Sequence, residues 1–186
     1  MRWLLVSLVA LAPGLAQPAS VSICYNYGCL SEERVEFDAD LLAGVAASLA
    51  GAPDAAAERT RLAAVVGRLY RFAGRHLPIH ADRAGDYLDE GVYGKMDCID
   101  HAASTTRLLE LLDGEGMLRF HRVMPQQRRT RFLIFQHFSA AVEELAADGE
   151  GGGAQYVIDS WFVEHGEAAV VLPLEAWLDG EGPNVQ

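Results

Sequence analysis

The 186-residue chain is poor in positive charge, in cysteine and in long hydrophobic runs. Lys and Arg total 15 against 26 Asp and Glu, so the formal net charge is −11. This charge repels the phosphates of nucleic acids and the headgroups of anionic lipids over a Debye length, which argues against a nucleic-acid partner. Apolar residues make up 51% of the chain and charged residues 22%, which excludes a disordered chain and a polytopic membrane protein.

A short apolar run lies at the N-terminus. It covers residues 3–12 and follows Arg2. Gly14 and Ala16 are small residues at the third and first positions before a cleavage point, an arrangement typical of a secretory signal peptide. About ten apolar residues are too few to span a bilayer as a helix. The sequence therefore predicts a signal peptide over residues 1–16, an exported protein that is periplasmic or secreted, and no membrane span.

Three cysteines leave one without a partner in an oxidising compartment. Cys24 and Cys29 lie close together just after the predicted cleavage point, so we expect a disulfide between them. A loop this short gives roughly 2 kcal/mol in the chain-entropy model, so the bridge should pin the N-terminal end without holding the fold together. Cys98 then remains as a free thiol, which is either a small buried hydrophobe or a group with a function.

The first half of the exported chain is predicted to be helical. The alanine-rich segment 36–50 predicts a helix with Asp38 or Asp40 as its cap, and apolar residues at a 3.6-residue spacing predict a second helix over 54–76. We place this helical part at residues 36–80. The segment that follows is rich in glycine and tyrosine, as is typical of a structured loop that frames a site.

The second half predicts one helix followed by an antiparallel sheet. Asp97 can cap a helix that begins at Cys98 and ends near Asp113. Three strand-like runs follow it, at residues 118–124, 131–145 and 155–163. A helical half followed by antiparallel strands is an α+β fold, which we expect to form a single domain over residues 17–186.

Cys98 is the strongest candidate for chemistry because it begins a predicted helix. Unpaired backbone N–H groups in the first turn of a helix stabilise a thiolate. The negative charges of Asp97 and Asp100 act in the opposite direction, since they raise the pKa of a neighbouring thiol. As a nucleophile, Cys98 therefore requires a histidine partner and a third group that orients the imidazole.

His137 and Asp159 are the partners that strand pairing favours. If the last two strand-like runs form a hairpin around the glycine-rich connection, these residues are cross-strand neighbours within a residue or two of register. Asp159 also lies among apolar residues, where a carboxylate is costly unless it is paired. Packing of the Cys98 helix across this sheet would complete a triad of Cys98, His137 and Asp159.

Three short motifs, taken in order, resemble the transglutaminase-like cysteine enzymes, which share a papain-like fold. The motifs are DCIDHA at 97–102, QHF at 136–138 and YVIDSW at 156–161. The core of that family is a helix that starts at the nucleophilic cysteine, followed by antiparallel strands that carry a histidine and then an aspartate. The resemblance covers residues 90–165. It implies that Cys98 accepts an acyl group, that His137 is the base and that Asp159 orients it.

The resemblance also implies a reaction class. Members of the family hydrolyse amides or transfer acyl groups to amines through a thioester, here on a peptide or protein substrate and without a cofactor. The chain departs from many members at Ser139, where an aromatic residue is common, and at Ser160, where proline is common. The backbone N–H of Cys98 and one further group would stabilise the oxyanion. Candidates for that group or for substrate contacts are Tyr87, Tyr93 and Trp161.

Two other interpretations stay open. His101 follows Cys98 by three residues, so it could be an alternative base or could bind a metal with Cys98 and Asp97. No second Cys or His cluster completes a zinc site, so we predict no metal. Alternatively, the chain is a non-catalytic module of the same fold that binds a peptide or an envelope protein. An enzyme must expose the sulfur of Cys98, and a binding module need not.

Overall fold

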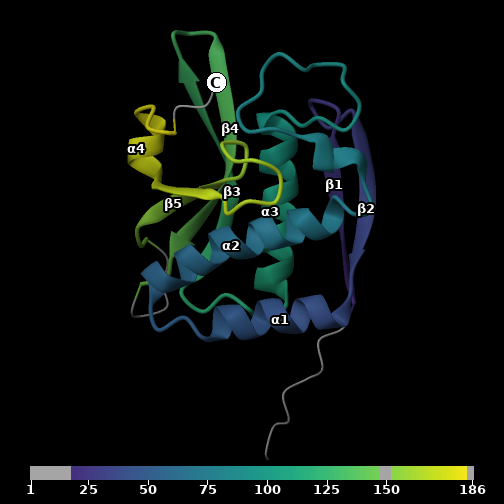
Figure 1. Ribbon diagram of the computed structural model, residues 1–186. Coiled ribbons are helices and arrows are strands. Elements are labelled where there is room, and N and C mark those ends of the chain that lie inside the picture. Colours follow the sequence, from purple (N-terminus) through teal and green to yellow (C-terminus); the bar gives the residue numbers. More distant parts are fainter. Residues whose placement is uncertain (1–17, 147–151, 184–186) are drawn as a thin grey trace, which may run out of the picture.

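The computed structural model describes residues 18–146 and 152–183 (Figure 1). Helices are combined with antiparallel strands, which confirms the predicted α+β class. The predicted signal peptide, residues 1–16, lies outside the described residues. Among the residues that are described, no helix combines the length and the apolar character needed to cross a membrane.

An N-terminal hairpin precedes the helices, where no strand was expected. It consists of β1 (Ala19–Tyr25) and β2 (Ser31–Phe37), which pair antiparallel. Val35 and Phe37 of β2 and Val21, Ile23 and Tyr25 of β1 alternate as buried residues, and Cys24 is buried as well. This period of two is the pattern of a sheet with one face on the core. The prediction of a helix from residue 36 was therefore wrong at its start, because the strand continues through Phe37.

Two helices follow the hairpin, and each begins at an aspartate. They are α1 (Ala39–Ala50) and α2 (Ala55–Ala73). The Asp38 carboxylate accepts a hydrogen bond of 2.7 Å from the third residue of α1, and Asp54 does the same for α2 at 2.8 Å. These caps satisfy backbone N–H groups that have no partner within the helix. A short 3₁₀ helix, η1 (Pro78–Ala81), comes next.

Helix α3 (Cys98–Gly114) begins at Cys98, as predicted. The Asp97 carboxylate accepts a hydrogen bond from the backbone N–H of Asp100 at 2.8 Å, and the Asp100 carboxylate accepts one from Asp97 at 3.3 Å. This reciprocal pair is a capping box, which fixes the residue at which the helix starts. Figure 1 shows α3 between the N-terminal hairpin and the larger sheet, and it contacts β1 on one side and β4 on the other.

The larger sheet is antiparallel, in the order β3-β4-β5-β6. Its strands are β3 (His121–Arg131), β4 (Phe135–Glu144), β5 (Gln155–Asp159) and β6 (Val170–Pro173). The prediction missed β6 and the short helix α4 (Leu174–Leu178) that follows it. It also ended the first strand at residue 124, whereas β3 continues past an irregularity in register between Met124 and Gln127. Pro125 lies in that irregularity, where a strand tolerates proline.

The buried apolar residues form two clusters. The larger one joins the N-terminal hairpin, the helices α1, α2 and α3, and the sheet. The smaller one is rich in aromatic side chains, and we call it the aromatic cluster; its members are Val157, Trp161, Phe162, Leu174 and Trp177. Cys98 packs against the aromatic cluster. The first residue of α3 therefore meets the end of β5 and helix α4.

Candidate functional site

Cys98 is partly exposed at the start of α3. The backbone N–H of Phe138 in β4 lies close enough to the Cys98 sulfur to favour the thiolate, although burial outweighs this effect. Burial, followed by the negative charges of Asp97 and Asp159, raises the pKa of the Cys98 thiol to about 11. Left to itself, the thiol is therefore protonated at neutral pH. A base must take its proton before the sulfur can attack a substrate.

His137 and Asp159 form a buried pair. Nε2 of His137 lies 2.7 Å from Oδ2 of Asp159. The pairing of β4 with β5 explains this contact: Ala140 lies opposite Ile158, and the same register places Asp159 opposite Ser139, two residues from His137. The two residues are diagonal neighbours across the strands. This geometry agrees with the predicted register of a residue or two.

The Asp159 carboxylate has three hydrogen-bond donors. Besides His137, the indole Nε1 of Trp177 donates to Oδ2 at 3.1 Å, and the backbone N–H of Trp161 donates to Oδ1 at 3.2 Å. These donors compensate the carboxylate for the loss of water. The nitrogen of a neutral imidazole that faces a carboxylate carries the proton, so His137 is protonated at Nε2 and bare at Nδ1.

The second ring nitrogen of His137, Nδ1, has no hydrogen-bond partner among the described residues. Nδ1 is buried, and within the described part of the chain no group forms a hydrogen bond with it. The imidazole lies among aromatic rings, with centroid distances of 4.9 Å to Trp161 and 5.1 Å to Phe162. Cys98 packs against the same aromatic cluster. The thiol and the imidazole therefore share one apolar environment, without a hydrogen bond between them.

The three aromatic candidates for the site lie in two different parts of the structure. Trp161 packs on His137, and the ring of Tyr87 lies 4.6 Å from that of Trp161. Burial and the charge of a nearby Cys98 thiolate raise the pKa of the Tyr87 hydroxyl. Tyr93 instead packs against Tyr25 of the N-terminal hairpin, at 6.0 Å. The structure therefore brings Tyr87 and Trp161 to the surroundings of Cys98 and leaves Tyr93 elsewhere.

His101 is engaged away from Cys98. Its Nε2 lies 2.9 Å from the Asp82 carboxylate, and its Nδ1 lies 2.8 Å from Oγ of Ser160. Both ring nitrogens are occupied in a buried setting. The alternative in which His101 is the base for Cys98, or a metal ligand beside it, does not fit this arrangement.

The contacts of His101 belong to a buried polar network that sequence analysis missed. Oγ of Ser160 lies 2.9 Å from Oγ1 of Thr105, which lies 3.1 Å from the hydroxyl of Tyr70. Asp82 also accepts a hydrogen bond from the backbone N–H of Met96 at 2.9 Å. The network joins α2, α3, the end of β5 and the segment before α3. A signal was present in the sequence, since His101 and Thr105 are four residues apart and so share one face of a helix.

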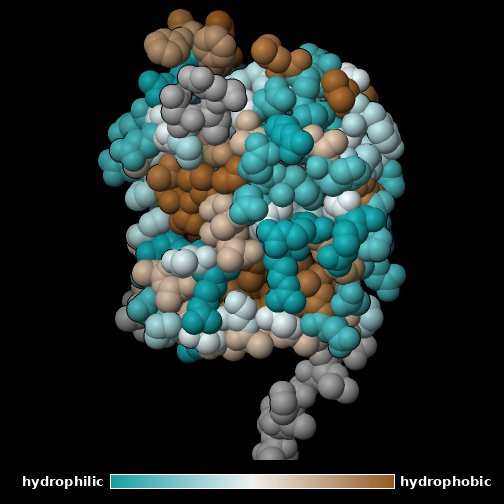
Figure 2. All heavy atoms as spheres, viewed as in Figure 1, coloured by the Kyte–Doolittle hydropathy of each residue, from teal (hydrophilic) through white to brown (hydrophobic). Residues whose placement is uncertain are grey.

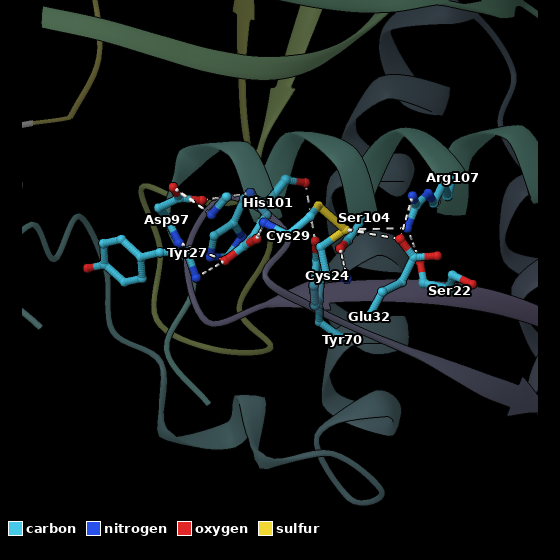
Figure 3. The surroundings of a disulfide bond; sticks show 12 residues. Ser22, Cys24, Tyr27, Cys29, Glu32, Tyr70, Asp97, His101, Ser104 and Arg107 are labelled. Carbon is cyan, nitrogen blue, oxygen red and sulfur yellow. Dashed lines mark hydrogen bonds and ion pairs between the residues drawn. A yellow bond between two sulfur atoms is a disulfide. The ribbon is translucent and has the colours of Figure 1, made fainter. Parts of the chain in front are cut away.

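The predicted disulfide between Cys24 and Cys29 is present, and Cys98 is the free cysteine. The loop that it closes rests on the start of α3 (Figure 3). The residues 26–29 all have positive φ angles, between 56° and 66°. In this conformation the backbone N–H groups of Tyr27 and Cys29 donate to the Asp100 carboxylate, at 2.8 Å and 2.5 Å.

The disulfide loop and the cap of α3 share the same two carboxylates. Asp97 accepts a hydrogen bond from the backbone N–H of Gly28 at 3.0 Å, in addition to its role as the cap. Burial, followed by the charge of Asp97, raises the pKa of the Asp100 carboxyl to about 6, although backbone hydrogen bonds oppose the shift. The disulfide thus does more than pin the N-terminal end, contrary to expectation, because its loop supports the turn that carries Cys98.

One group of side chains has the spacing of a metal site. The potential ligand atoms of Cys24, Cys29 and Asp100 all lie within 4.8 Å of one another. The two sulfurs are joined in the disulfide, so they offer no thiolate to an ion. In the bridged form, this group is therefore part of the support for α3 and not a metal centre.

The chemistry available to Cys98, His137 and Asp159 is nucleophilic. Nδ1 of His137 has no partner, a buried carboxylate holds the opposite nitrogen, and the thiol packs against the same aromatic cluster. Such an arrangement can remove the thiol proton and stabilise the imidazolium that forms. Comparisons of the chain with protein-family models, curated proteins and solved structures found no match.

Proposed function

We propose that this chain is a thiol-dependent amidase, peptidase or acyltransferase of the transglutaminase-like type, with Cys98 as nucleophile, His137 as base and Asp159 as the orienting group. The geometry of His137 supports the proposal: Nε2 is held by Asp159 at 2.7 Å, and Nδ1 is buried without a partner among the aromatic rings of the cluster against which Cys98 packs. His101, in contrast, has contacts at both ring nitrogens.

The proposed reaction begins with the transfer of the thiol proton to Nδ1 of His137. The sulfur attacks the carbonyl carbon of a peptide or side-chain amide, the carbon–nitrogen bond breaks, and the proton passes from Nδ1 to the departing amine. A thioester on Cys98 remains. Water attacks it in a hydrolase, or a second amine attacks it in an acyltransferase, and Nδ1 takes the proton of the attacking group. The carbon–sulfur bond then breaks, the acid or the new amide leaves, and the proton returns from Nδ1 to the sulfur of Cys98. Asp159 stabilises the imidazolium at each stage.

The surroundings of Cys98 supply groups for the developing oxyanion. The backbone N–H of Cys98 lies in the first turn of α3, where partial positive charge collects. The hydroxyl of Tyr87 is the second candidate, because its raised pKa keeps it protonated and therefore able to donate. Trp161 would form the wall behind the imidazole. Cys98 is partly exposed, which supports its role as a nucleophile that a substrate must reach.

The disulfide favours an oxidising compartment for this chemistry. Bridges of this kind persist in the periplasm or outside the cell and are rare in the cytosol. We therefore place the proposed enzyme in an exported setting, with a peptide or protein as its substrate. The acidic charge of the chain favours neutral or cationic substrates over anionic polymers.

Formation of an acyl-enzyme tests the proposal. The exported protein is incubated with p-nitrophenyl acetate, and the acetyl group is located by peptide mass mapping. We expect acetylation of Cys98, its loss in Cys98→Ser, and a much slower reaction in His137→Gln. The control is His76→Gln, since His76 is an exposed histidine. Acetylation of Cys98 at the same rate in wild type and His137→Gln would refute the assignment of the base.

A non-catalytic module of the same fold is the second candidate. The observation that favours it is the pKa of the Cys98 thiol, about 11, because a protonated and partly buried thiol suits a packing role. Such a module would bind a peptide or an envelope protein. In that case Cys98 would not be acetylated in the wild type, and Cys98→Ser would bind the same partner as well as wild type does.

A further inference from the structure

The β3–β4 hairpin ends in an exposed apolar tip. Its four consecutive residues are Phe132, Leu133, Ile134 and Phe135, with exposed fractions of 78%, 94%, 73% and 64%. Figure 1 shows this hairpin projecting beyond the rest of the fold, and Figure 2 shows brown side chains standing clear of the surface at that end. Exposed apolar residues are normally scattered singly, so a projecting run of four marks an interaction surface.

The backbone of the tip holds these side chains outward. Phe132 and Leu133 have φ angles of 49° and 66°, a region that bulky residues rarely adopt. The backbone N–H of Ile134 donates to the carbonyl of Arg131 at 3.2 Å and closes the turn. Such a conformation is unfavourable for residues other than glycine. Core packing does not explain it, because the side chains at the tip are not buried.

The hairpin is basic in an acidic chain. Within the hairpin, residues 121–142 contain four arginines and no aspartate or glutamate, and Glu143 and Glu144 lie at the end far from the tip, although the chain as a whole has a net charge of −11. Three of these arginines, Arg128, Arg129 and Arg131, directly precede the tip. In the described residues none of the three forms an ion pair with a carboxylate, whereas Arg122 further along the strand does so with Glu143. The tip is therefore an apolar turn, and the arginines that precede it carry positive charge without a carboxylate partner.

We propose that the tip, residues 132–135, inserts into the interfacial region of a bilayer that contains anionic lipids. The apolar side chains would enter the boundary between headgroups and acyl chains, and Arg128 and Arg131 would meet the lipid phosphates. The net charge of −11 opposes this contact at long range. At physiological ionic strength, charges farther than about 8 Å are screened, so close to the lipid the arginines beside the tip act more strongly than distant carboxylates. Repulsion of the acidic body would orient the molecule with the tip toward the lipid.

The shape of the tip favours a lipid surface over a protein partner. A stable protein interface buries about 800 Å² on each side, and four side chains on a convex turn offer less. A convex turn can insert shallowly into a bilayer. Burial of its apolar side chains and attraction of nearby arginines to lipid phosphates both stabilise the inserted state. Figure 1 also shows the loop before α3 reaching the same end of the molecule, where Leu88 is exposed. The inference stands apart from the proposed catalysis, because it uses none of the three catalytic candidates.

Flotation of the exported protein with lipid vesicles tests the inference, once N-terminal sequencing has verified the removal of residues 1–16. We expect binding to vesicles of phosphatidylcholine with phosphatidylglycerol and much weaker binding to phosphatidylcholine alone. Leu133→Ser should lower the partition coefficient about tenfold. The matched control is Ala47→Ser, because Ala47 is an exposed apolar residue of α1, which Figure 1 shows at the opposite end of the molecule, and the change should have no effect.

A second pair of variants tests the charge. Arg128→Gln should lower binding to the anionic vesicles about fivefold, whereas Arg34→Gln, at an exposed arginine of the N-terminal hairpin, should not. Absence of binding to either kind of vesicle would overturn the inference. So would equal binding by wild type and Leu133→Ser. Dimerisation that Leu133→Ser abolishes, without vesicle binding, would overturn it in favour of a second copy of the chain as the partner.

Discussion

Asp159 and Ser160 are consecutive residues, yet they hydrogen-bond to histidines on different elements. Asp159 contacts His137 of β4, and Ser160 contacts His101 of α3. The end of β5 therefore fixes both the helix that begins with Cys98 and the strand that carries His137. The two residues therefore have different roles: Asp159 orients the imidazole of His137, and Ser160 helps to position α3 through His101. Substitutions at the two positions should have different effects.

Asp159→Asn should leave the fold intact and remove most of the reactivity of Cys98. The amide nitrogen would donate to Nε2 of His137, so the proton of the imidazole would move to Nδ1, where it blocks the uptake of the thiol proton. In a triad, a change of this kind costs about 10⁴-fold in rate. Acetylation kinetics with p-nitrophenyl acetate measure the effect, and circular dichroism checks the fold. Wild-type alkylation and acetylation rates in Asp159→Asn would remove Asp159 from the triad.

Ser160→Ala should act mainly on stability. The change removes the hydroxyl that contacts His101 at 2.8 Å and Thr105 at 2.9 Å, and it leaves buried polar groups without a partner. The expected loss is about 1 to 3 kcal/mol in the free energy of unfolding, measured by urea denaturation. The acetylation rate of the folded protein should fall far less than in Asp159→Asn, because the Ser160 hydroxyl contacts His101 and Thr105 and not the proposed triad. A loss of rate as large as that in Asp159→Asn, without a loss of stability, would contradict this division of roles.

Asp100 should give the stability of the protein a pH dependence between pH 3.8 and about 6, the ordinary and the raised pKa of its carboxyl. A raised pKa means that the folded state binds the proton more tightly than the unfolded state does. The contribution of this group to stability therefore increases as the pH falls through this window and decreases as the pH rises. Urea midpoints of wild type and Asp100→Asn across the window measure it. Parallel profiles for the two proteins would contradict the assignment to Asp100.

The bridge between Cys24 and Cys29 should be the sole disulfide of the protein. Replacement of both cysteines by serine should lower the free energy of unfolding by roughly 2 kcal/mol, because the short loop gains freedom in the unfolded chain. It should also loosen the start of α3, which shares Asp97 and Asp100 with this loop. Peptide mapping without reduction establishes the pairing. A cross-link between Cys98 and either of the other cysteines would contradict the structure.

The start of α3 and the pairing of β4 with β5 could be predicted because local signals fix them. Asp97 followed by Asp100 is a strong cap, so it placed Cys98 at the first helical position. The glycine-rich connection defined the centre of the hairpin, and strand pairing by residue number then brought His137 to Asp159. The α+β class followed from the order of these elements.

Other parts of the fold lack such signals. The N-terminal hairpin turns through Asn26 and Tyr27 with positive φ angles, although neither is glycine, and the bonds to Asp97 and Asp100 that support this turn come from distant sequence. β6 and α4 are too short to show periodicity, so the role of Trp177 as a donor to Asp159 could not be foreseen. The pairing of His101 with Asp82 likewise depends on tertiary packing across a loop.

The pH dependence of iodoacetamide alkylation at Cys98 tests the central claim most directly, when wild type is compared with His137→Ala. The account predicts that alkylation of wild type follows an apparent pKa well below about 8.5, the value of a free thiol. This apparent pKa describes the coupled titration of the thiol and the imidazole. In His137→Ala, the apparent pKa should rise, because burial and the charges of Asp97 and Asp159 then act on the thiol with no imidazole to take its proton. A thiol in wild type that does not react, or a profile that the substitution leaves unchanged, would contradict the claim that Cys98 and His137 form a catalytic pair.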